Sequence, residues 1–129
     1  MAMEVEKEVH VYRFNPKKIT EEPVYLNRVR VTGELRFLRF LRDSYFGLFY
    51  PGHAAIYGIN EDSLRVETVF NKKYGLKESM QLYDVSKPLD NTLNVYFVEL
   101  TSTRKTHILW RIELSLKVLS EFKKLTRIY

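Results

Sequence analysis

Alternating apolar and polar residues at the start of the chain predict a β-hairpin. The segments EVHVYRF (8–14) and VYLNRVRV (24–31) both alternate with a period of two, and a turn-rich connection with Pro16 and Pro23 joins them. The valines would form the core face: Val9, Val11, Val29 and Val31. The opposite face would carry His10, Tyr12, Phe14, Leu26, Arg28 and Arg30.

The next segment predicts a helix. Thr32 is a favourable N-cap residue, and Glu34 would lie in the first turn, where the helix dipole favours an anion. In ELRFLRFLRDSYF (34–46) the apolar residues recur at helical spacing, and Gly47 would end the helix. A basic stripe would follow its flank: Arg36, Arg39 and Arg42.

Further strands are predicted in the second half of the chain. HAAIYGIN (53–60) and SLRVETVF (63–70) would flank the turn Glu61-Asp62-Ser63, and NTLNVYFVEL (91–100) reads as a third strand. The polar segment 71–88 is predicted to be irregular, with one helical turn at most. WRIELSLKV (110–118) alternates like a strand but also fits a helical stripe, so both alternatives stay open. The last segment, 116–129, favours a helix.

This order of elements predicts an α+β fold of β-grasp type, in which a mixed sheet surrounds one main helix. The 129 residues suit one domain. Residues 8–100 would form the β-grasp-like core. Residues 101–129 would be a basic C-terminal extension, a strand or helix that completes the core or forms an interface.

Several short motifs resemble one family. EVHVYRFNPKKITEEPVYLNRVRV resembles the first hairpin of the N-terminal plant-type [2Fe–2S] ferredoxin domain in succinate dehydrogenase and fumarate reductase iron–sulfur subunits. Asp43 and the run Gly47–Tyr50 look like that domain's approach to its cluster loop. The strand at 52–60 and Leu64-x-Val66-x-Thr68 resemble the family's two later segments. The resemblance implies a β-grasp fold, with Val66 in the place of the last cluster cysteine.

The cluster itself is excluded by composition. A [2Fe–2S] cluster needs four thiolates, or two thiolates and two imidazoles. The chain has no Cys, and its three histidines, His10, His53 and His107, are far apart in the sequence. The family's electron transfer therefore does not carry over, and we expect no cofactor and no metal. We also find no phosphate-binding loop and no metalloprotease or hydrolase motif, so we expect a protein that is not an enzyme.

Charge and aromatic residues suggest two candidate binding surfaces. From Arg104 to the end the chain has seven basic residues and two acidic ones, Glu113 and Glu121. The net charge of this segment is therefore +5, equal to that of the whole chain. The first surface suits single-stranded nucleic acid, or is simply a solvated strand face: Tyr12, Phe14, Arg28 and Arg30, with Arg36 and Arg39 nearby. The second would pair with a partner or a second copy, or else complete the fold: Trp110, Lys117, Phe122, Lys123, Lys124, Arg127 and Tyr129.

These observations predict a non-enzymatic, macromolecule-binding domain. The first hypothesis is a protein-interaction module, such as a homodimer formed through the C-terminal segment. The alternatives are a nucleic-acid-binding protein and a cluster-free accessory subunit of a redox complex. No window is apolar enough for a membrane span and the N-terminal residues do not resemble a targeting peptide, so we expect a cytoplasmic protein without membrane insertion. The single Gln81 and the absent Cys are typical of a thermophile.

Overall fold

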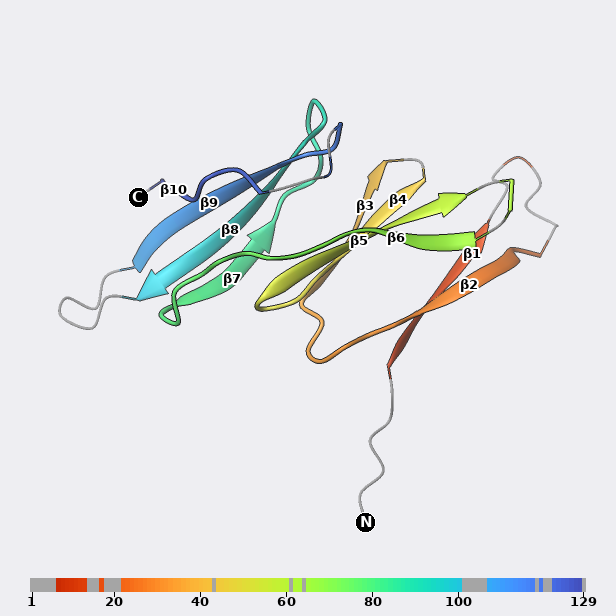
Figure 1. The fold of residues 1–129 in the computed structure, drawn as a ribbon, viewed down its shortest axis with the longest axis horizontal. Helices are drawn as coiled ribbons and strands as arrows, with labels where there is room; N and C mark the ends of the chain where they lie inside the picture. The colour runs from red at the N-terminus through yellow and green to blue at the C-terminus, as the bar shows by residue number, and fades with distance from the viewer. Residues whose placement is uncertain are drawn as a thin grey trace, which may run out of the picture.

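The chain folds into β-strands throughout the part that the structure describes. The computed structural model describes residues 7–13, 17, 22–42, 44–60, 62–63, 65–100, 107–117, 119 and 122–128. Within these ranges the regular elements, drawn in Figure 1, are β1 Glu8–Arg13, β2 Val24–Arg30, β3 Phe37–Arg42, β4 Tyr45–Phe49, β5 His53–Asn60, β6 Arg65–Lys73, β7 Met80–Val85, β8 Thr92–Leu100, β9 His107–Ser115 and β10 Thr126–Arg127. The predicted α+β fold is therefore wrong, because the fold is all-β.

The strands form three antiparallel sheets, each made of strands that are consecutive in the sequence. Strands β1 and β2 form the hairpin; β3, β4, β5 and β6 form the middle sheet in that order; β7 to β10 form the C-terminal sheet. Figure 1 shows the middle sheet between the other two. No helix in the described residues could cross a membrane.

The centre of the middle sheet, at β4, is buried on both faces. On one face, Phe46 and Leu48 of β4 join Val11 and Val29 of the hairpin in one core cluster. On the other face, Phe49 belongs to a second cluster, with apolar residues of the C-terminal sheet. Residues 46–50 are consequently all buried. A strand covered on both faces reads as a continuous apolar run rather than an alternating one.

The predicted helix at 34–47 is instead the end of a loop followed by β3 and β4. Phe37 packs on the cluster shared with the C-terminal sheet, and Leu38 packs on the cluster shared with the hairpin. Apolar residues on both faces of β3 imitate the spacing of a helix, so tertiary burial overrides the local helix preference. Gly47 lies inside β4 and lacks the positive φ of a helix C-cap; among the described glycines only Gly33 and Gly75 have one.

The predicted hairpin is confirmed, with one correction. Val9 pairs with Val29, and Val11 and Val29 are buried as expected. However, Val11 pairs with Asn27 and Tyr12 with Tyr25, so Leu26 is an extra residue in β2, a β-bulge. Leu26 therefore packs on the core instead of joining the outer face, and Tyr25 takes its place there.

The strands predicted at 53–60, 63–70 and 91–100 are confirmed as β5, β6 and β8. The turn after β5 is an ordinary hairpin turn, in which the Asn60 side chain accepts hydrogen bonds from the backbone amides of Asp62 and Ser63 (3.0 and 3.2 Å). Of the two alternatives for the segment from Trp110, the strand is confirmed as β9. The irregular structure predicted for 71–88 is wrong for residues 71–73, where β6 continues to Lys73, and for β7 at Met80–Val85; residues 74–77 and 86–88 are irregular as predicted.

The helix predicted for 116–129 is also wrong in its described part. Residues 122–128 run antiparallel to β9: Phe122 forms a bridge with Leu114, Thr126 pairs with Arg111, and the Ile128 amide donates to the Leu109 carbonyl at 2.7 Å. The apolar spacing that predicted a helix has another cause here: Phe122 and Leu125 both pack on the core, although the chain that carries them is extended.

The close packing of β4 predicts the effect of a single methyl group. A Cβ added at Gly47 would meet the Phe49 ring at 2.7 and 2.9 Å, and that ring is completely buried. We expect Gly47→Ala to lower the free energy of unfolding by about 1–3 kcal/mol, as overpacked cores do. Urea unfolding, followed by the fluorescence of the single Trp110, measures it.

Gly52→Ala is the matched control, because an added Cβ at Gly52 has no atom within 4 Å. It should change the free energy of unfolding by less than about 0.5 kcal/mol. Equal urea midpoints for Gly47→Ala and the unmodified protein would contradict the two-sided burial of β4.

Candidate functional site

The outer face of the hairpin presents a row of exposed aromatic rings. Tyr12 is 55% exposed and meets Tyr25 edge-on, with ring centroids 5.4 Å apart. The His10 ring lies 5.8 Å from Tyr25. The structure thus places Tyr12 and Arg28 on one face, as the sequence predicted, and adds Tyr25 and His10. Phe14 lies outside the described residues.

An acidic side chain offsets part of the charge on this face. Glu8 lies 3.5 Å from the Arg28 guanidinium and 3.4 Å from His10. Arg30 lies opposite Glu8 in the register of the two strands. The face therefore carries cations and rings together, but with a carboxylate among them.

The two remaining arginines of this candidate surface do not join it as a stripe. Arg36 lies in the loop just before β3, whereas Arg39 lies inside the strand, and the two side chains have different partners. Arg36 is exposed and pairs with Glu34 at 3.5 Å. Arg39 instead ties β3 to β7: its Nε donates to the Val85 carbonyl at 3.2 Å, and its guanidinium lies over the Phe37 ring. Arg39 is a structural residue that joins two sheets.

The second candidate surface is largely part of the fold. Phe122 packs edge-on against Phe70, with centroids 5.1 Å apart, and against Tyr74 at 5.5 Å. Trp110 is partly buried, and its indole N–H donates to Glu99 at 3.2 Å. The segment 122–128 covers the edge of β9 that we expected to be open. The edge is therefore not available for a partner strand.

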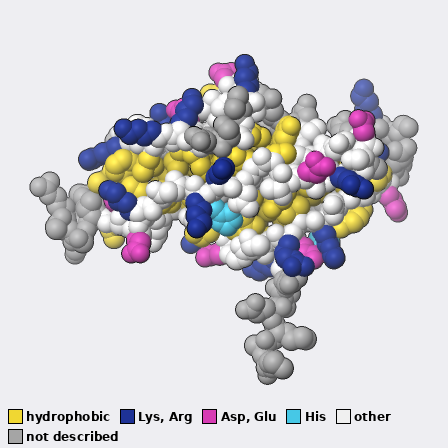
Figure 2. All heavy atoms as spheres, viewed as in Figure 1, with side chains coloured by type: hydrophobic (Ala, Val, Ile, Leu, Met, Phe, Trp, Pro, Cys, Tyr) yellow, Lys and Arg dark blue, Asp and Glu magenta, His cyan; other side chains and the backbone are white. Residues whose placement is uncertain are grey.

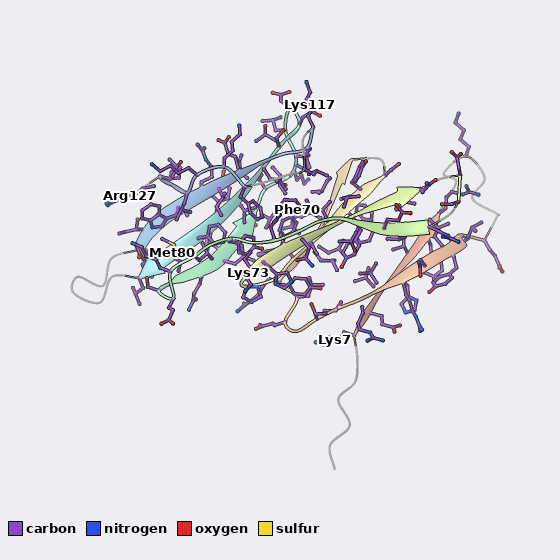
Figure 3. The ribbon with its side chains drawn as sticks, in the orientation of Figure 1. Lys7, Phe70, Lys73, Met80, Lys117 and Arg127 are labelled. Atoms are coloured by element: carbon purple, nitrogen blue, oxygen red, sulfur yellow. The ribbon has the colours of Figure 1, made fainter. Side chains whose placement is uncertain are left out.

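The basic residues of the C-terminal segment do not gather in one patch. Lys123 lies 3.6 Å from Glu113, and Lys117 and Arg127 lie at opposite ends of β9 (Figure 3). On the face shown in Figure 2, Lys and Arg side chains are scattered, with Asp and Glu among them. Lys124 is exposed. Tyr129 lies outside the described residues.

The outer face of the C-terminal sheet is an apolar surface that sequence reasoning missed. Tyr83 and Leu100 are 63% and 55% exposed, and none of the apolar residues of this face belongs to either core cluster. We call it the apolar outer face; it consists of Tyr83, Tyr96, Val98, Leu100, Leu109 and Ile128. A shallow depression of about 520 Å³ lies in it, lined by Gln81, Leu82, Tyr83, Val98, His107 and Leu109.

A signal for this face exists in the sequence. In β8 the residues that point outward, such as Tyr96 and Val98, are as apolar as the inward residues Val95 and Phe97. An antiparallel strand with one solvated face alternates between apolar and polar residues. The missing alternation in 95–100 therefore indicates a second face that is suited to being covered.

The described residues show no arrangement typical of a catalytic or metal site. They contain no buried charged or polar residue and no group of three or more His, Asp or Glu side chains that could hold a metal ion. Burial raises the pKa of Tyr74, and burial, with a smaller effect of Tyr50, raises the pKa of Tyr57. Both hydroxyls therefore stay protonated at neutral pH. His53 stacks flat on Tyr50, with centroids 4.5 Å apart.

The chain matches no protein-family model, no curated protein and no solved structure. The comparisons therefore neither support nor refute the resemblance to the ferredoxin domain. The β-grasp fold that the resemblance implied is contradicted by the all-β structure.

The position of Phe122 predicts a loss of stability rather than a loss of binding. Because its ring fills the core between Phe70 and Tyr74, Phe122→Ala should lower the free energy of unfolding by about 2 kcal/mol, below the range for a fully buried Phe. Urea unfolding is again the measurement.

Lys124→Ala, in the same segment but exposed, is the control and should change stability by less than about 0.5 kcal/mol. If both variants unfold at the same urea concentration as the unmodified protein, Phe122 does not belong to the core.

Proposed function

We propose that the protein is a non-enzymatic, cytoplasmic protein-interaction module that binds its partner through the apolar outer face. The observation that carries the proposal is the exposure of Tyr83, Leu100 and Ile128 on a sheet whose other face is already part of the core. A contiguous apolar surface in water costs free energy, and such surfaces mark interaction sites.

The composition of the face supports a protein as the partner. Its centre is apolar and aromatic, with Val98, Leu109 and Tyr96 on adjacent strands. Around this centre lie polar and charged side chains: Gln81, Asp84, Asn94, His107, Arg111 and Glu113. An apolar centre with a polar rim is the usual anatomy of protein–protein interfaces.

Binding of single-stranded nucleic acid by the hairpin is the weaker candidate. The exposed rings of Tyr12 and Tyr25 favour it, because bases stack on aromatic side chains. Glu8 opposes it by pairing with Arg28, and Arg39 is engaged elsewhere. Oligonucleotide binding whose affinity falls steeply with salt would bring this candidate to first place. The accessory subunit of a redox complex rests on the ferredoxin resemblance alone.

Photo-crosslinking tests whether the apolar outer face is covered in the cell. Tyr83→p-benzoylphenylalanine places a crosslinker on the face with little change in shape. In cells that naturally produce the protein, we expect irradiation to give a discrete adduct of higher mass, because a partner lies within reach of position 83.

Asp62→p-benzoylphenylalanine, in the exposed turn between β5 and β6, is the matched control and should give no such adduct. The absence of any adduct at position 83, or equal adducts at both positions, would show that this face is not an interaction surface.

A further inference from the structure

We propose that the partner on the apolar outer face is a second copy of this chain, related by a two-fold axis that runs parallel to the strands between β8 and β9. The inference rests on the proposed function, since it names the occupant of the same face. The observation behind it is the pattern of side chains on the face: when two copies of the face are related by this axis, the residues that meet form favourable pairs.

The register of the sheet arranges the outward side chains in rows across the strands. One row runs Gln81, Val98, Leu109, and Ile128 continues it through its hydrogen bond to Leu109. A second row runs Asp84, Tyr96, Arg111, Thr126. A third contains Asn94 and Glu113, and a fourth Leu100 and His107.

Rotation by 180° about this axis leaves each row at the same height along the strands. It places β8 of one copy opposite β9 of the other. Each outward residue of β8 then faces, on the second copy, the residue that is its own neighbour on β9. In an isologous interface every such contact occurs twice. The test of the arrangement is therefore whether each neighbouring pair across β8 and β9 is also a favourable pair across the interface.

The pairs at the centre of the face meet this condition. Val98 faces Leu109 of the second copy, which buries two apolar side chains from water. Tyr96 faces Arg111, whose guanidinium can lie over the phenol ring. Asn94 faces Glu113, so that an amide N–H can donate to a carboxylate. Along these rows no two charges of the same sign are opposed.

The outer strands fit the same axis. It places β7 of one copy opposite β10 of the other, so that Asp84 faces Thr126, which follows the exposed Lys124. Asp84 also lies 3.7 Å from the Arg39 guanidinium of its own chain, so its charge is already partly offset. The outer strands therefore bring a carboxylate and a hydroxyl together without opposing two charges of the same sign.

The size of the face fits a small interface. β8 and β9 each contain nine residues, β7 contains six, and the segment 122–128 runs along β9. At about 3.3 Å per residue and about 4.8 Å between strands, these segments cover a flat footprint of about 490 Å². Standard interfaces take about 800 Å² of accessible surface from each partner, and accessible area exceeds the flat footprint because side chains are rough.

Light scattering of the purified chain tests the inference. We expect a mass of twice the 15.4 kDa of one chain at high concentration, falling toward one chain on dilution. Val98→Lys should weaken the dimer by about tenfold or more, because it places two charges against apolar side chains at the centre. Leu100→Lys, at a 55% exposed position that the fold does not need, should also weaken it.

Val24→Lys makes the same change as Val98→Lys at a 44% exposed position on the hairpin and should leave the dimer intact. A dimer that resists both Val98→Lys and Leu100→Lys would overturn the inference. So would a chain that stays monomeric at millimolar concentration.

The crosslinking experiment separates this inference from the proposed function. An adduct of two chains at position 83 supports both. A monomeric chain whose position 83 still crosslinks to a different protein would overturn the second copy as partner and leave the interaction surface standing. A monomeric chain without any adduct would overturn both.

Discussion

The structure depends on the burial of β4 and β5 between two other layers. Phe46 and Leu48 face the hairpin, while Phe49 and Ile56 face the C-terminal sheet. Each large apolar side chain taken out of water contributes about 1.5–3 kcal/mol, so two adjacent strands hold most of two cores together. A two-stranded hairpin is marginal on its own, and here it is stable because the middle sheet covers its valines.

This constraint also explains where sequence reasoning succeeded. Strands with one covered face kept their alternation: Val11 in β1, and Ile112 and Leu114 in β9, are buried as their positions predicted, and Val9 packs on the same core while partly exposed. It failed for β3 and β4, where apolar residues lie on both faces and the sequence loses the period of two. Leu38 and Leu41 were then read as a helical stripe, although they belong to different cores. Periodicity alone does not separate a fully buried strand from a buried helix.

The candidate surfaces divide for the same reason. Tyr12 and Arg28 were placed together correctly because β1 and β2 alternate, whereas Arg36 and Arg39 were grouped by the spacing of a helix that the structure does not contain at this position. Phe122 was grouped with the second candidate surface, with completion of the fold as the alternative. The structure favours the alternative, because Phe122 packs against the core from an extended chain. The apolar outer face was missed because it joins residues from three strands and Ile128 after β10, and the register that aligns Val98 with Leu109 follows from the fold.

Native-state hydrogen exchange tests the central claim most directly. If β4 and β5 hold both cores, the amides of residues 46–49 and 54–56 exchange only through global unfolding, with a free energy equal to that from urea unfolding. The amides of β1 and of Ile128 should exchange with a lower free energy of opening, since the hairpin and the last strand can unfold locally while the middle sheet stays folded. The account would be contradicted if the amides of β4 exchanged as readily as those of β1, because the middle sheet would then not be the most stable part of the molecule.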